Sequence, residues 1–105
     1  MEINVTFRHT ETSAVLKEHI QTVINEKLSK FFIKPTIAHV TLNVEGSRHI
    51  AEISLAENHS LFNAREESHD MYLSVDRALT KIETQLKKYK EKIKDHNKKP
   101  IRSFA

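Results

Sequence analysis

The feature that most constrains this chain is the segment of residues 70–99, in which apolar residues recur in alternating steps of three and four. This spacing places them along one side of an α-helix, and that side has to be buried against another part of the protein. Asp70 is suited to cap the first turn, and Pro100 predicts that the helix stops just before it. The apolar positions are Tyr72, Val75, Leu79, Ile82, Leu86, Tyr89 and Ile93.

The other sides of this predicted helix are basic. Residues 87–102 hold eight basic and two acidic residues, a balance of +6, which leaves −3 for the rest of a chain whose net charge is +3. A positive end on a slightly acidic body indicates a polyanionic partner, either nucleic acid or an anionic membrane. A solvated helix face explains the charge equally well. Two basic stripes flank the side opposite the apolar one: Lys87, Lys90, Lys94 and Lys98, and then Arg77, Lys81, Lys88, Lys92 and Lys99.

Shorter elements precede this helix. Alternating apolar residues predict strands over residues 2–8, 37–44, 48–56 and 61–68, and Gly46 marks a hairpin between the second and third. A helix is expected from Thr12, its predicted cap, to about Lys30. Its predicted apolar stripe is Val15, Leu16, Ile20, Val23, Ile24, Leu28 and Phe31.

The resulting order is β-α-β-β-β-α. Because each strand is apolar on one face only, both helices are expected on the same face of a four-stranded sheet. The fold class is therefore an α/β two-layer sandwich, with a right-handed crossover that leaves the first strand parallel to a neighbour. We expect one domain over residues 1–97 and a short, disordered basic tail over residues 98–105.

The sequence offers little for catalysis. The single glycine excludes the usual nucleotide-binding loops and the GxSxG motif, and the absence of cysteine excludes a thiolate nucleophile. Seven histidines are present, but no two lie within four residues of each other. Glu66 and Glu67 point to opposite faces of their strand, so they make a poor acid/base pair. We expect no enzyme, no catalytic residue, no metal and no cofactor.

The partners and location follow from the same residues. No apolar run is long enough to span a membrane, and residues 1–9 read as a strand rather than a secretory signal. We expect a cytoplasmic protein, monomeric in solution, with no membrane partner and no small-molecule substrate. Tyr72 and Tyr89 are candidates for stacking on bases, although their place in the apolar stripe favours the core.

Several stretches together resemble a known family. They are the Asp-Met-Tyr step at 70–72, the Lys-rich helix over 81–96, the strand at 40–45 and the helix start at 15–17. The chain is similar in these stretches to the short ribosome hibernation-promoting factors and the ribosome-associated inhibitor proteins, once called sigma-modulation proteins. His69 departs from the small or polar residue usual before the motif, and the chain has no room for the second domain of long members.

The resemblance implies a fold like a double-stranded-RNA-binding domain. It also implies binding to the rRNA of the small ribosomal subunit in the decoding region, where the protein blocks mRNA and the A- and P-site tRNAs. Translation would then be inhibited in stationary phase or stress. The residues expected to bind rRNA are Lys17, Lys27, Lys30, Arg77, Lys81, Lys87, Lys88, Lys90 and Lys94, and the family motif is Asp70, Met71 and Tyr72.

Other functions stay open at this point. One is a different rRNA-binding module, such as a ribosome maturation factor. Another is a protein-interaction domain that modulates transcription. The sequence does not distinguish a factor that promotes ribosome dimers from one that holds single ribosomes inactive.

Overall fold

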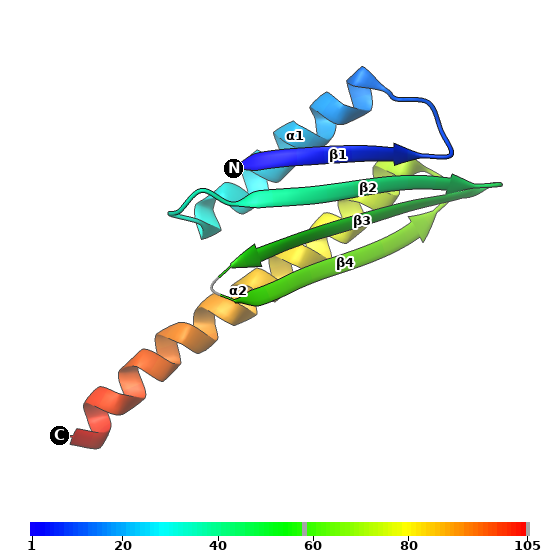
Figure 1. Cartoon of the computed structure of the whole chain (residues 1–105). Coiled ribbons are helices and arrows are strands. Elements are labelled where there is room, and N and C mark those ends of the chain that lie inside the picture. The colour runs from blue at the N-terminus through cyan, green and yellow to red at the C-terminus, as the bar shows by residue number, and fades with distance from the viewer. Residues whose placement is uncertain (58, 105) are drawn as a thin grey trace.

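The computed structural model describes the backbone of residues 1–57 and 59–104, and the side chains of these residues as far as Lys92. The elements follow the predicted order, with a short 3₁₀ turn added after the first helix (Figure 1). They are β1 (Glu2–Arg8), α1 (Ala14–Leu28), the 3₁₀ turn η1 (Ser29–Phe31), β2 (Ile37–Glu45), β3 (Arg48–Glu57), β4 (Ser60–Ser68) and α2 (Met71–Phe104).

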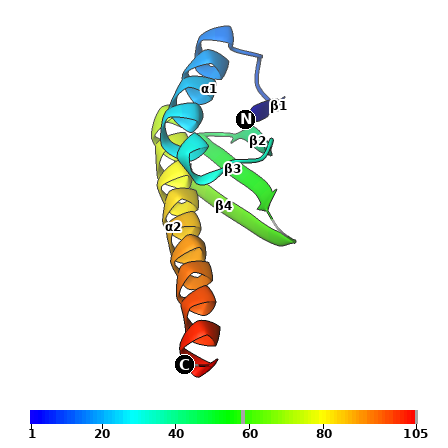
Figure 2. The ribbon, with the colours of Figure 1, turned by 90° about the vertical axis from the view of Figure 1, so that its left-hand side faces the viewer.

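The four strands form one sheet in the order β1-β2-β3-β4. β1 runs parallel to β2 because α1 carries the chain back between them, whereas β2, β3 and β4 are joined as antiparallel hairpins. Gly46 has a φ of 63°, in the left-handed region, in the two-residue loop between the paired residues Glu45 and Arg48. Both helices lie on the same face of the sheet (Figure 2), so the predicted two-layer sandwich is confirmed.

The core lies between the helices and the inner face of the sheet. α1 contributes one buried residue per turn, and α2 contributes a continuous stripe that begins at its first residue. The predicted burial of Leu79, Ile82 and Leu86 is confirmed, because none of these side chains is exposed. The buried helix residues are Leu16, Ile20, Ile24 and Leu28 of α1, and Met71, Val75, Ala78, Leu79, Ile82 and Leu86 of α2.

Among the described side chains, the predicted stripes were wrong at one position in each helix; the side chain of Ile93 lies outside the described residues. Tyr72 is 39% exposed and Val15 is 70% exposed. On α2 the buried surface also takes in Ser74 and Ala78, two small residues that carry no clear apolar signal. The centre of the buried side therefore lies further from Tyr72 than the large apolar residues alone indicate.

The ends of the two helices also differ from the prediction. Ser13, rather than Thr12, caps α1, because its Oγ accepts a hydrogen bond of 3.1 Å from the amide of Leu16. α2 continues past Pro100 to Phe104 and extends beyond the sheet (Figure 1). A proline withholds one amide donor, and here the helical backbone continues with that donor missing. The expected domain limit at residue 97 stays a prediction.

Hydrogen bonds to the neighbouring strands and a capping residue fix the start of α2. The predicted cap is confirmed, since Asp70 Oδ1 accepts a 3.1 Å hydrogen bond from the amide of Tyr72. Ser74, which is fully buried, donates through its hydroxyl to the carbonyl oxygen of His49 at 2.6 Å. Its Oγ also lies 2.7 Å from the hydroxyl of Ser68 at the end of β4. The first turn of α2 is thereby tied to both β3 and β4.

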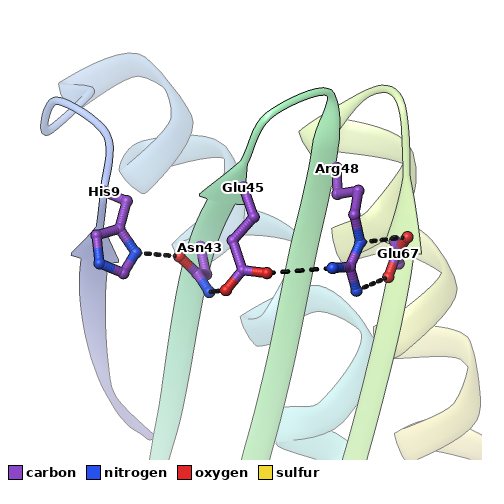
Figure 3. Close-up of polar contacts among 5 residues, drawn as sticks. All are labelled: His9, Asn43, Glu45, Arg48 and Glu67. Carbon is purple, nitrogen blue, oxygen red and sulfur yellow. Dashed lines mark hydrogen bonds and ion pairs between the residues drawn. The ribbon is translucent and has the colours of Figure 1, made fainter.

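A chain of polar side chains crosses the sheet at one end (Figure 3). His9 donates through Nδ1 to Oδ1 of Asn43 at 2.8 Å, and Asn43 donates to Glu45 at 3.1 Å. Arg48 donates to Glu45 at 3.2 Å and makes two further bonds to Glu67, of 2.9 and 2.8 Å. The hydrogen bond from Arg48 is the main cause that lowers the pKa of Glu67 below its ordinary value of 4.5.

The first prediction tests the burial of α2. Ile82→Ala should lower the free energy of unfolding by about 2–5 kcal/mol, because it leaves a cavity in the closed core. Leu73→Ala is the matched control on the same helix, since Leu73 is 41% exposed, and it should change stability by less than about 0.5 kcal/mol. Urea unfolding of both variants measures the difference. Equal effects would mean that the buried side of α2 is misplaced.

The second prediction concerns acid stability. Folding lowers the pKa of Glu67 below its ordinary value of 4.5, so its ion pair with Arg48 stabilises the fold fully at pH values above 4.5. This stabilisation is lost as the pH falls through the lowered pKa of the folded state. Glu67→Gln should therefore lower the melting temperature at neutral pH, and the gap from the wild type should close in acid. Glu26→Gln, an exposed residue of α1, is the control and should show no such gap. A gap that stays constant with pH would contradict this role of the carboxylate.

Candidate nucleic-acid interface

Basic side chains project from the helix layer. Lys17 and Lys27 are exposed on α1, and Arg77, Lys87 and Lys88 are exposed on α2. Within the described part of the chain, none of these five makes an ion pair or a side-chain hydrogen bond. Their charged groups are therefore available to an external anion, and their contact with rRNA stays a prediction.

Three other predicted contacts are lysines that are already paired within the protein. Lys81 lies 2.9 Å from Glu66 of β4, and Lys90 lies 2.8 Å from Glu57 at the end of β3. Lys30 is 3.9 Å from Glu83, a separation too long for a hydrogen bond. Surface ion pairs of this kind contribute about 0–1 kcal/mol, so an incoming phosphate can replace the carboxylate. The side chain of Lys94 lies outside the described residues.

The two basic stripes of α2 lie on different sides of the helix. The Lys30–Glu83 contact shows that the side bearing Glu83 and, one turn later, Lys87 faces η1, the turn that follows α1. The Lys81–Glu66 pair shows that the side bearing Lys81 and, two turns later, Lys88 faces β4. The exposed surface of α2 between these sides is therefore flanked by positive charge on both edges.

The residues of the Asp-Met-Tyr motif have three different positions. Asp70 caps α2, Met71 is buried in the core at 7% exposure, and Tyr72 is exposed. The rings of Tyr72 and of His19 of α1 make an edge-to-face contact with their centroids 5.0 Å apart. His19 Nε2 also lies 3.8 Å from Asp76 Oδ1. The motif thus positions the helix start and leaves one aromatic ring beside the α1–α2 boundary.

The second tyrosine candidate is part of the core. Tyr89 is half-buried, and its ring meets the edge of Phe62 at 5.2 Å. The interpretation that favoured the core is therefore right for Tyr89 and wrong for Tyr72. Contacts such as Tyr72–His19 join distant parts of the chain, and no local pattern in the sequence signals them.

The outer face of the sheet has a different charge pattern. Alternation along the strands places four carboxylates and three guanidinium groups on this face, and Arg48 holds two of the carboxylates. This face therefore has no excess of positive charge, and the basic surface is confined to the helix layer. The charged residues of the outer face are Glu2, Glu45, Glu52, Glu67, Arg8, Arg48 and Arg65.

The described residues contain no cluster of three or more metal-ligating side chains. Glu66 and Glu67, considered above as an acid/base pair, contact different partners on the two faces of the sheet, Lys81 and Arg48. In the part of the chain that the structure describes, no helix has a stretch both long and apolar enough to cross a membrane.

Solved structures share this architecture. The N-terminal domain of Protein Y from Thermus thermophilus superposes with a TM-score of 0.77 at 26% identity, covering 85% of this chain and 99% of that domain. A ribosomal subunit interface protein from Coxiella burnetii gives a TM-score of 0.71 at 31% identity, covering 87% of this chain and 99% of that chain.

Sequence comparisons agree with the structural ones. The chain is 32% identical over 96 residues to the ribosome hibernation promoting factor of Salmonella typhimurium, and these residues are 91% of this chain and 100% of that protein. The factor of the same name from Pseudomonas putida is 29% identical over 92 residues, which are 88% of this chain and 89% of that protein. The family model described as Sigma 54 modulation protein / S30EA ribosomal protein matches residues 3–94. The chain belongs to this family.

Membership in the S30EA family confirms the resemblance drawn from the Asp-Met-Tyr step and the Lys-rich helix. The range matched by the S30EA family contains every basic residue and motif residue predicted for the site. The part of α2 that packs on the sheet lies in this range too, so the family model spans both the core and the basic surface. Which lysines contact a partner stays a prediction.

Proposed function

We propose that this protein is a ribosome hibernation factor. It binds the decoding region of the small ribosomal subunit, occupies the path of mRNA and of the A- and P-site tRNAs, and inhibits translation in stationary phase or stress. The S30EA family, the relatives named ribosome hibernation promoting factor and the structural likeness to a ribosomal subunit interface protein support this proposal.

The observation that carries the proposal is the uneven distribution of charge between the two layers. The helix layer presents basic groups without carboxylate partners, whereas the charges on the outer sheet face are nearly balanced and partly paired. Lysine and arginine contacts to phosphate fix the position of a protein on nucleic acid without reading its sequence. Folded rRNA, which displays phosphates and 2′-hydroxyls on an irregular shape, suits such a surface.

The mechanism follows from occupancy alone. The domain has a closed core, so it binds as a rigid body and excludes other ligands from the space that it fills. No bond is made or broken, and the protein acts in the cytoplasm as a monomer without a cofactor. Lys81 exchanges the carboxylate of Glu66 for a phosphate on binding, and Lys90 adds a phosphate contact while it stays beside Glu57. Among the described residues, the unpaired Lys17, Lys27, Lys87 and Lys88 gain a partner.

The third prediction tests the phosphate contacts. The quadruple variant Lys17→Gln, Lys27→Gln, Lys87→Gln and Lys88→Gln should bind small subunits more weakly than the wild type. The slope of log affinity against log salt should flatten by about 3 units if all four contact phosphate, because each contact releases about 0.7–0.9 counterions. Binding across a salt series measures the slope, and thermal melts check that the variant is folded.

A double variant on the other layer provides the control. Arg8→Gln with Arg65→Gln removes positive charge from the outer face of the sheet and should leave the salt slope close to that of the wild type. If the quadruple variant is folded and keeps the wild-type slope, the basic helix layer does not face rRNA.

The fourth prediction tests what the bound protein blocks. Labelled protein bound to small subunits should be displaced by mRNA together with tRNA, and in a purified translation system it should inhibit at near-stoichiometric amounts. The quadruple variant should inhibit only at much higher concentration. A maturation factor would bind without competing with tRNA, and a transcription modulator would keep its partner after nuclease treatment, so either result would contradict the proposal.

A further inference from the structure

A cavity of about 540 Å³ opens beside α2 at the end of the sheet where β3 stops. Three parts of the chain that are distant in sequence meet there: η1 with the loop that follows it, the last residue of β3, and the side of α2 that faces them. The lining residues are Lys30, Phe31, Ile33, Lys34, Glu57 and Lys90.

The charges at this cavity favour an anion. Three ammonium groups line it against one carboxylate, that of Glu57. Glu57 is only 16% exposed, and its carboxylate holds Lys90 through a 2.9 Å hydrogen bond. Lys90 Nζ also lies 5.8 Å from the ring centroids of both Phe32 and Tyr89. Lys90 is therefore held in place by its surroundings.

The other two ammonium groups have donors to spare. Lys30 is 60% exposed and approaches Glu83 only to 3.9 Å, so it donates no hydrogen bond there. Lys34 makes no ion pair among the described residues. An anion in the cavity would thus meet one positioned ammonium group and two that can turn toward it. Several separate oxygens on one group, as in phosphate, match three such donors better than a single carboxylate.

The rim of the cavity is apolar. Ile33 is fully exposed, at 103% of the reference area, and Phe31 is half-buried with Lys30 Nζ lying 5.5 Å from its ring centroid. A single exposed isoleucine is ordinary on a protein surface. Next to an anion site, however, Ile33 and Phe31 offer contact area to a ligand that carries a flat apolar group beside its negative charge.

We propose that this cavity binds a single nucleotide, with its phosphate among Lys30, Lys34 and Lys90 and its base against Ile33 and Phe31. The nucleotide can be one residue of an RNA strand or a free mononucleotide, since both present the same chemistry. This site goes beyond the proposed function, because Ile33, Lys34 and Glu57 belong to no predicted rRNA contact and the binding does not require a ribosome.

The test is an NMR titration of the full chain, labelled on backbone amides and isoleucine methyl groups. AMP should shift the signals of Ile33 and of the amides from Lys30 to Lys34 and at Glu57, and the shifts should saturate. Inorganic phosphate should bind more weakly at the same amides, and adenosine, which has no phosphate, should not saturate. No AMP response at these residues would overturn the proposal.

Two variants separate the parts of the site. Lys34→Gln should weaken AMP and inorganic phosphate alike, by about fivefold, because one charged donor is lost. Ile33→Ser should weaken AMP and leave inorganic phosphate unchanged, because only the base loses its contact. Arg8→Gln removes one charge from the outer sheet face and should bind AMP as the wild type does. Equal AMP affinity in all three variants would refute the site.

Further arms identify the source of the nucleotide. If a short single-stranded RNA competes with AMP, and Lys34→Gln also weakens small-subunit binding, the ligand is a residue of rRNA. If Lys34→Gln weakens AMP binding but leaves small-subunit binding unchanged, the ligand is a free nucleotide. An acidic peptide that binds the cavity while AMP does not would refute the proposal. For the wild type, no AMP response together with intact subunit binding refutes this site alone, whereas AMP binding without subunit binding refutes only the proposed function.

Discussion

The burial of one side of α2 against the sheet is the interaction on which the rest of the structure depends. Val75, Leu79, Ile82 and Leu86 are completely buried, so the helix cannot turn about its axis without opening the core. Successive residues of a helix are separated by about 100°, and a closed core tolerates no rotation of that size. The same contacts that stabilise the domain therefore decide which basic side chains point outward.

This dependence explains why much of the fold was predictable from the sequence and part of the site was not. The strands, the sheet face and the buried stripe of α2 each follow from patterns within a short window, and the structure confirms them. Tyr72 was misplaced because the small residues Ser74 and Ala78 contribute to the buried side without raising its apolar signal. The cap at Ser13 was missed because Thr12 has the same chemistry one residue earlier.

The pairing of lysines could not be predicted for a different reason. Lys81 and Glu66 are 15 residues apart, and Lys90 and Glu57 are 33 apart, so only the folded chain brings them together. From sequence all the lysines of α2 look alike. In the structure Lys81 and Lys90 connect α2 to the ends of the sheet, while Lys87 and Lys88 have no such partner among the described residues. The basic surface therefore contains lysines that are paired with a carboxylate of the sheet and lysines that have no such partner among the described residues.

The division between the layers also gives the domain a preferred orientation toward a polyanion. The net charge of the chain is only +3, so its attraction to a polyanion depends on where the positive groups lie. The unpaired positive groups gather on the helix layer, whereas the outer face carries four carboxylates against three guanidinium groups, so the helix layer is the side that a polyanion attracts. At physiological salt, charges are screened over a Debye length of about 8 Å. The difference between the two faces therefore acts only when the domain is close to its partner. The charge pattern thus selects the binding side when the domain is already close to its partner.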